Sequence, residues 1–191
     1  MEYLSLRDYH RLAQRTSQKD GHDKIDNGVL GLIGETGELV DLYKKWVYQT
    51  TPGTKFPFHA AVNELGDVMW YLEELADGMG TSMNMISPMT FEGLDQMTDG
   101  VKPLPTLRSV ITGLSSHANN IRKAVDMNDR DAVCENMRKA LNTCAWLARL
   151  ADTPMMRVAI LNVEKLKQRY PEGFDAKISM ARSAKEYTSH S

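Results

Sequence analysis

The chain has 191 residues, enough for one domain with a hydrophobic core and too few for two large domains. Its composition, 42% hydrophobic and 25% charged, is typical of a globular protein and excludes disorder throughout the chain. The net charge of -2, with no long basic block, excludes bulk attraction to nucleic acid, and no apolar run approaches the roughly 20 residues that span a membrane.

Apolar residues recur with the period of an α-helix along most of the chain, and no segment alternates like a half-buried strand. The sequence therefore predicts an all-α fold. The expected helices span residues 5–16, 28–47, 59–79, 106–127, 130–151 and 153–170. Residues 81–105 are rich in Met, Gly and Pro, so we expect a long irregular connection there.

Two of these helices carry apolar stripes with the i, i+3, i+4 spacing of a buried face. The stripe of helix 28–47 consists of Leu39, Leu42, Tyr43, Trp46 and Val47. The stripe of helix 59–79 consists of Leu65, Val68, Met69, Leu72, Leu75 and Ala76. Because prolines and a glycine interrupt the chain between them, the two helices are expected to pack as an antiparallel hairpin.

Four carboxylates extend these apolar stripes. Glu35 and Glu38 each lie one helical turn before a leucine of the first stripe, and Glu64 and Asp67 lie beside the second, so all four are expected to point inward. Glu38 and Asp67 are each nine residues, about 14 Å, from the expected turn, which predicts that they sit level. Such a cluster needs compensation by protonation, by lysines or by bound cations.

The chemistry of this cluster favours Mg²⁺ or Mn²⁺ among the cations. The donors are all oxygens, and no histidine follows at i+3 or i+4 as in zinc or di-iron sites. Because Mg²⁺ keeps water ligands and usually shares phosphate oxygens, the cluster predicts a phosphate-bearing substrate. A single Glu-x-x-Glu spacing is more typical of surface charges; two inward pairs at one level favour a site.

These residues resemble a known family. Glu35-x-x-Glu38 in GLIGETGELVDLYKK and Glu64-x-x-Asp67 in NELGDVMWYL resemble the paired metal motif of the MazG-like nucleoside triphosphate pyrophosphohydrolases, members of the all-α NTP pyrophosphatase superfamily. LRDYHRLAQRT is similar to the first helix of the family, and NVEKLKQRYPEGFDAKISMARS is similar to its last. The resemblance covers residues 5–80 and 153–182 of a single domain, residues 1–191, and makes residues 81–152 an insert with an extra helical hairpin.

The resemblance implies an antiparallel helical bundle that hydrolyses a (deoxy)nucleoside triphosphate to the monophosphate and pyrophosphate. It implies that Glu35, Glu38, Glu64 and Asp67 hold Mg²⁺, with Mn²⁺ as a possible substitute. Either Glu35 or Glu38 is expected to be the catalytic proton acceptor, and the sequence leaves the choice open. The family pattern also implies a homodimer or homotetramer, although the insert offers a way to complete the bundle within one chain.

Six further residues are expected to bind the substrate. Lys165 and Arg169, four residues apart on one helix face, are suited to adjacent phosphates, and they match the family positions together with Asn162 and Tyr170. Lys45 is a candidate phosphate contact and Trp46 a candidate platform for the base. Each has an ordinary alternative: a solvated basic helix face, a lysine that complements the helix dipole, or a core tryptophan.

Two other functions remain open at the level of sequence. The first is a base-specific enzyme, dUTPase-like or dCTPase-like, in which the insert supplies base contacts. The second is a non-catalytic helical module that binds metal and a protein partner. We expect a cytoplasmic protein because the first residues lack the apolar core of a signal peptide, and we expect Cys134 and Cys144 to be reduced, buried thiols on one helix.

The sequence also suggests an internal repeat. WYLEELADGMGTSMNMI at residues 70–86 and WLARLADTPMMRVAI at residues 146–160 share a tryptophan, the triplet LAD and a following apolar segment. One hypothesis is a duplicated helical hairpin whose second copy lost its acids, and chance similarity between helices is the alternative.

Overall fold

The computed structural model describes residues 3–17 and 23–175, and these residues form helices and connecting loops without a strand. The all-α prediction is therefore confirmed for this part of the chain. The elements are α1 (Leu6–Ala13), η1 (Gln14–Thr16), α2 (Lys24–Gln49), α3 (Phe58–Gly78), α4 (Met83–Ile86), α5 (Phe91–Thr98), α6 (Leu107–Asp126), α7 (Arg130–Leu150) and α8 (Met155–Arg169). Residues 176–182, which the family resemblance includes, lie outside the described residues. None of the helices described has the length and apolar character needed to cross a bilayer.

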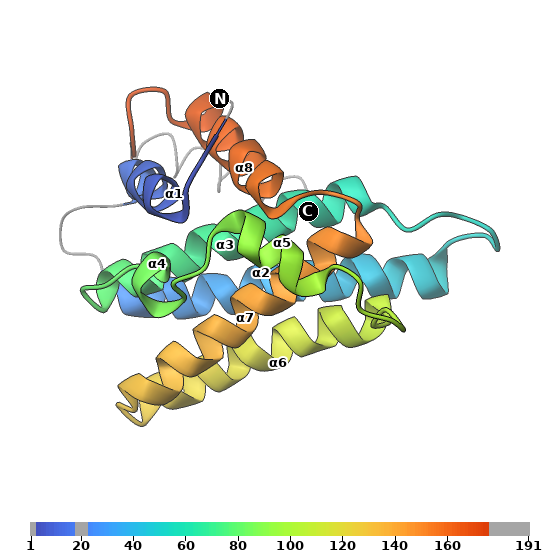
Figure 1. Ribbon diagram of the computed structural model, residues 1–191, viewed down its shortest axis with the longest axis horizontal. Helices are drawn as coiled ribbons and strands as arrows, with labels where there is room; N and C mark the ends of the chain where they lie inside the picture. The colour runs from blue at the N-terminus through green and yellow to red at the C-terminus, as the bar shows by residue number, and fades with distance from the viewer. Residues whose placement is uncertain (1–2, 18–22, 176–191) are drawn as a thin grey trace, which may run out of the picture.

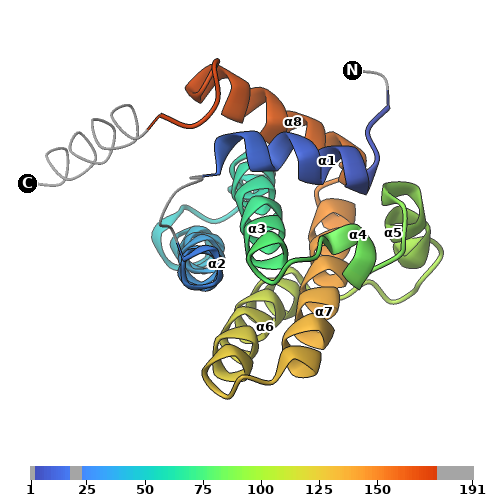
Figure 2. The same cartoon turned by 90° about the vertical axis from the view of Figure 1, so that its left-hand side faces the viewer.

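Two helical hairpins pack side by side (Figures 1 and 2). The first consists of α2 and α3, the second of α6 and α7; α6 packs on α2, and α7 packs on α3. The second hairpin thus covers the first within a single chain. Figure 2 shows α1 and α8 lying across the other side of α3, and both contact it. A homodimer or homotetramer stays a prediction.

Side chains and backbone turns set the ends of these helices. Asp23 accepts hydrogen bonds from the backbone of Ile25 and Asp26, so α2 begins at Lys24 and not at residue 28 as expected. Residues 81–105, expected to form a long irregular connection, contain two short helices. Thr90 caps the start of α5, whose Phe91 is buried in the core, and α4 precedes it.

The apolar stripe of α3 is confirmed, whereas that of α2 is only partly buried. All six residues predicted for α3 are at most 2% exposed. In α2, Leu39 is fully buried, but Leu42, Tyr43 and Trp46 are half-buried and Val47 is 41% exposed. Aromatic side chains of the following loop cover this end of α2 instead of a helix: the Trp46 ring packs edge-on against Phe56, and its Nε1 donates to Thr54 O.

One of the two cysteines is buried as predicted, and the sequence match that suggested a repeat is not reproduced in the structure. Both cysteines lie on α7 and form no disulfide, but Cys134 is half-buried, and only Cys144 matches the expectation of a buried thiol. The two hairpins have corresponding topology. The LAD triplets do not correspond, because Asp77 lies within α3 whereas Asp152 follows the end of α7.

The close approach of α2 and α3 predicts a large effect of a small substitution. Gly28→Ala is expected to lower the free energy of unfolding by about 1 to 3 kcal/mol, because a Cβ there would lie 2.8 Å from the backbone nitrogen of Leu75. Gly34→Ala on the same helix is the matched control, since no atom lies within 4 Å of its added Cβ. Alanine favours helix over glycine, so the control is expected to gain up to about 1 kcal/mol in urea unfolding. Equal losses in both variants would contradict this packing.

Candidate metal and substrate site

Three of the four predicted carboxylates come together between α2 and α3. Glu35 of α2 and Glu64 and Asp67 of α3 each offer a carboxylate oxygen, and these oxygens all lie within 4.8 Å of one another. All three side chains are half-buried. Among the described residues, this is the only group of acidic, histidine or cysteine side chains with such geometry. We call Glu35, Glu64 and Asp67 the carboxylate site.

Glycines set the register that assembles the carboxylate site. A Cβ on Gly28 would meet Leu75, and a Cβ on Gly31 would lie 2.1 Å from the ring of Tyr71. Because the helices are antiparallel, continuing this register by one turn brings Glu35 level with Asp67. The prediction that Glu38 sits level with Asp67 was therefore wrong by about one turn.

Glu38 is exposed and lies outside the carboxylate site, contrary to the prediction that it points inward. The buried neighbours on α2 are instead Leu39 and Thr36, and Thr36 donates its hydroxyl to Leu32 O. Burial and the nearer acids are the main causes that raise the pKa values of Glu64 and Glu35, and the charge of Glu38 adds a smaller contribution to both.

Burial and mutual repulsion keep the carboxylate site short of full ionisation at neutral pH. Burial, followed by the charges of Asp67 and Glu64, raises the pKa of Glu35 to about 7. Burial and Asp67 also raise the pKa of Glu64. At neutral pH Glu35 is therefore partly protonated in the folded protein, whereas a solvated glutamate would be ionised.

Two predicted substrate-binding residues of α8 contact the carboxylate site. Lys165 Nζ lies 2.5 Å from Asp67 Oδ2 and also donates to the backbone oxygen of Asn63 at 3.3 Å. Asn162 Nδ2 donates to Asp67 Oδ1 at 3.0 Å. Both oxygens of Asp67 are therefore held by the same helix.

The other four predicted substrate-binding residues are not in contact with the carboxylates. Arg169 is half-buried one turn beyond Lys165, whereas Tyr170 lines a small cavity between α1 and α8 and packs on Phe174. Lys45 forms an ion pair with Asp41 at 2.6 Å, and Trp46 belongs to the aromatic cover of the hairpin end. Lys45 is ten residues, about 15 Å, from Glu35 along α2, so it lies far from the carboxylate site, near the end of the helix.

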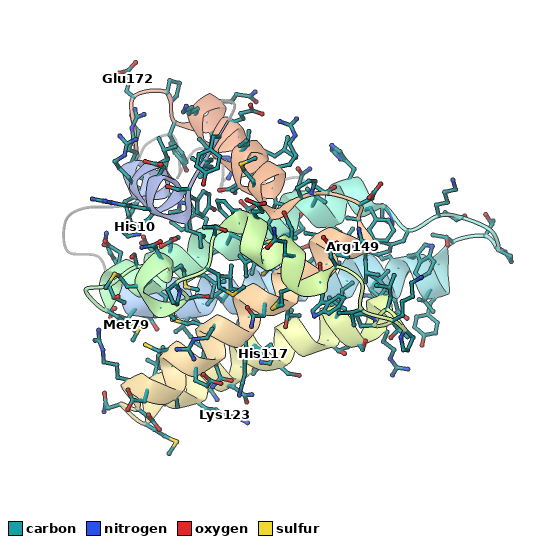
Figure 3. The ribbon with its side chains drawn as sticks, in the orientation of Figure 1. His10, Met79, His117, Lys123, Arg149 and Glu172 are labelled. Carbon is teal, nitrogen blue, oxygen red and sulfur yellow. The ribbon has the colours of Figure 1, made fainter. Side chains whose placement is uncertain are left out.

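A second polar cluster, which the sequence analysis did not identify, joins α1, α2 and α3. His10 lies between α1 and the C-terminal end of α3 (Figure 3), with Nδ1 2.9 Å from Glu73 Oε2. Glu73 is 1% exposed and also accepts the backbone N–H of Met83, while Asp77 pairs with Lys24 at 2.5 Å. The hydrogen bond to Glu73 raises the pKa of His10. With a lysine and a histidine beside its acids, this cluster ties three helices together.

A cavity of about 300 Å³ lies elsewhere, at the ends of α5 and α7. Its lining residues are Asp95, Thr98, Asp99, Arg149, Asp152, Thr153 and Pro154. None of them belongs to the predicted site, so this cavity is separate from the carboxylate site.

The donor set of the carboxylate site fits a hard divalent cation. Its three carboxylates offer only oxygen ligands, which Mg²⁺ and Mn²⁺ prefer. Three ionised carboxylates and the ammonium of Lys165 leave two negative charges, the charge that one such cation neutralises. A divalent cation here would balance this charge, and in the cation-free protein the raised pKa of Glu35 lowers the charge instead.

Comparison of this chain with models of known protein families, with curated proteins and with solved structures gave no match. The proposed function therefore depends on the residues of the site, their geometry and the motifs in the sequence.

Proposed function

We propose that the protein hydrolyses a nucleoside triphosphate between its α and β phosphates, releasing the monophosphate and pyrophosphate. The observation that carries this proposal is the half-buried carboxylate site, whose three oxygens lie within 4.8 Å of one another beside the ammonium of Lys165. Motifs that resemble those of the MazG-like pyrophosphohydrolases support it. An all-oxygen cation site next to a lysine suits a polyphosphate because the substrate itself supplies the remaining ligands.

Glu35, Glu64 and Asp67 would hold the divalent cation, which would neutralise the triphosphate and lower the pKa of a bound water. Of the two candidate proton acceptors, Glu35 is favoured, because it lies within the carboxylate site, and in the cation-free protein burial raises its pKa to about 7. Glu38 is exposed, and its negative charge helps to keep that pKa high.

Lys165 is suited to a second task once a cation shares Asp67. Its side chain is 27% exposed, and its ammonium lies beside Asp67, from where it can turn toward a phosphate oxygen. Arg169 lies one turn further along the same helix and offers a forked donor for the next phosphate. These two cations of α8 would grip the triphosphate while α2 and α3 hold the cation.

The test is a nucleotide panel assayed with Mg²⁺ in ¹⁸O-labelled water. We expect monophosphate and pyrophosphate as products, with the label in the monophosphate because water attacks the α phosphorus. Comparable rates for all bases indicate a general pyrophosphohydrolase, whereas a preference above about 100-fold for dUTP or dCTP indicates the base-specific alternative. Binding of Mn²⁺ without pyrophosphate release from any nucleotide would contradict the proposal and favour the non-catalytic module.

A further inference from the structure

The hydroxyl of Tyr9 reaches the carboxylate site through one intervening side chain. Tyr9 belongs to α1, is 1% exposed and donates its hydroxyl to Asn162 Oδ1 at 2.9 Å. Asn162 is 2% exposed and forms the second hydrogen bond, since its Nδ2 donates to Asp67 Oδ1 at 3.0 Å. Three helices thus meet in a buried chain of hydrogen bonds that ends on a carboxylate of the site.

This chain has a fixed direction. The amide of Asn162 has one donating and one accepting end, and the carboxylate of Asp67 requires the donating end. The accepting end then faces Tyr9, whose hydroxyl keeps its proton because burial, Glu73 and Asp67 raise its pKa well above 10. A flipped amide would turn its oxygen toward the carboxylate, so Asp67 selects the orientation of Asn162, and the Tyr9 hydroxyl then holds the amide in place by donating to its oxygen.

Gly66 allows this chain to form. A Cβ on Gly66 would lie 2.9 Å from the Cβ of Asn162, so α8 can come this close to α3 only because the side chain is absent. The backbone oxygen of Gly66 is also 3.4 Å from the Tyr9 hydroxyl, a longer contact than the one to the amide. Gly66 immediately precedes Asp67, so α1, α3 and α8 meet next to a carboxylate of the site.

We propose that Tyr9 is a positioning residue of the carboxylate site: its hydroxyl holds the amide of Asn162, and this amide holds Asp67 in the orientation that a divalent cation requires. The inference rests on one part of the proposed function, the binding of a divalent cation by the carboxylate site, and does not depend on hydrolysis of a nucleotide. Groups that orient metal ligands typically change metal affinity 10- to 100-fold when they are removed. Tyr9 acts one side chain further out, so the lower end of this range applies.

The test measures Mn²⁺ affinity in the absence of nucleotide, from the free-ion signal in electron paramagnetic resonance. Tyr9→Phe removes one oxygen and keeps the ring, and it is expected to weaken Mn²⁺ binding about tenfold. Tyr43→Phe, at a half-buried position on α2, is the matched control and is expected to leave the affinity unchanged. Asn162→Leu, which removes the direct contact to Asp67, is expected to weaken binding at least as much as Tyr9→Phe and keeps the test available should Tyr9→Phe not fold.

A double-mutant cycle separates positioning from simple stabilisation. With leucine at position 162, Tyr9→Phe is expected to have no further effect on Mn²⁺ affinity, because the chain to Asp67 is already broken. A folded Tyr9→Phe protein that unfolds more readily but binds Mn²⁺ like the wild type would overturn the inference and leave the proposed function intact. Weakened Mn²⁺ binding in a protein that releases no pyrophosphate supports the inference while refuting the proposed function.

Discussion

Asp67→Asn is expected to slow pyrophosphate release at least about 10³-fold, equivalent to about 4 kcal/mol of transition-state stabilisation. Asp67 is the carboxylate that both Asn162 and Lys165 contact, and it lies within 4.8 Å of the other two acids of the site. The substitution removes a cation ligand and leaves one of the two donors that hold Asp67, Lys165 or Asn162, facing an amide N–H. The fold is expected to survive, because one negative charge fewer relieves the repulsion that raises the pKa of Glu35.

The matched control for this variant lies on the same helix. Asp77 is ten residues, about 15 Å, beyond Asp67 on α3 and pairs with Lys24 at 2.5 Å, as Asp67 pairs with Lys165. Asp77→Asn should therefore lose a comparable ion pair and keep the rate of pyrophosphate release within about twofold. Rates are compared at saturating Mg²⁺ and nucleotide. Similar losses in the two variants would indicate that any broken ion pair on α3 disturbs the fold.

The stability of the cation-free protein is expected to fall as pH rises from about 4.5 to about 7. Glu35 has a pKa of about 7 in the folded protein and the ordinary value of 4.5 when unfolded. Between these values the folded state binds more protons, so raising the pH favours unfolding. The hydrogen bond to Glu73 raises the pKa of His10, so loss of the His10 proton also lowers the stability as the pH rises above the unfolded pKa of 6.5. Mn²⁺ at about 100 times its dissociation constant should raise the free energy of unfolding by about 2.7 kcal/mol at pH 8.

Glu35→Gln isolates the contribution of this carboxyl group. A neutral side chain removes the part of the pH dependence due to Glu35, which is on the order of 1 to 2 kcal/mol after solvent screening, and most of the stabilisation by Mn²⁺. Asp41→Asn, on the same helix, is the control: the pKa of Asp41 is lowered by Lys44 and Lys45, and its charge lies outside the site. Urea unfolding at pH 5 and pH 8 checks both variants. A wild-type protein equally stable at both values, with no response to Mn²⁺, would contradict the assigned site.

The helices could be predicted from the sequence where local chemistry determines them. The six buried residues of α3 follow a complete helical stripe, and caps such as Asp129 at the start of α7 act within a single turn. The end of α2 was harder to predict, because burial of its stripe depends on which element covers it. Here Phe56 of the following loop packs on Trp46 of the stripe, while Val47 stays 41% exposed.

The carboxylate site was predictable in composition but not in detail. Acid spacing on two consecutive helices predicted that Glu35, Glu64 and Asp67 would meet. Glu38 lies outside the site because of the register between α2 and α3. Gly28 and Gly31 set this register by letting Leu75 and Tyr71, which are distant in the sequence, approach closely. A helical stripe alone does not fix that register to within one turn.

Residues that act through distant partners could not be predicted. Tyr9 reads as an ordinary member of an apolar helix face, and its hydroxyl gains a role only because Asn162, 153 residues later, faces it. Glu73 likewise looks like a surface acid, yet His10 and the backbone of Met83 pair with it in a buried position. Such burial depends on the packing of α1 and α4 against α3, which local sequence patterns do not encode.

The central claim is that three carboxylates from two neighbouring helices bind a divalent cation. Crystals grown with Mn²⁺ and a non-hydrolysable nucleotide, measured at a wavelength where manganese scatters anomalously, test it most directly. The account predicts an anomalous peak coordinated by Glu35, Glu64 and Asp67, with phosphate oxygens completing its ligands. A nucleotide bound elsewhere, with no anomalous peak among these three side chains, would contradict it.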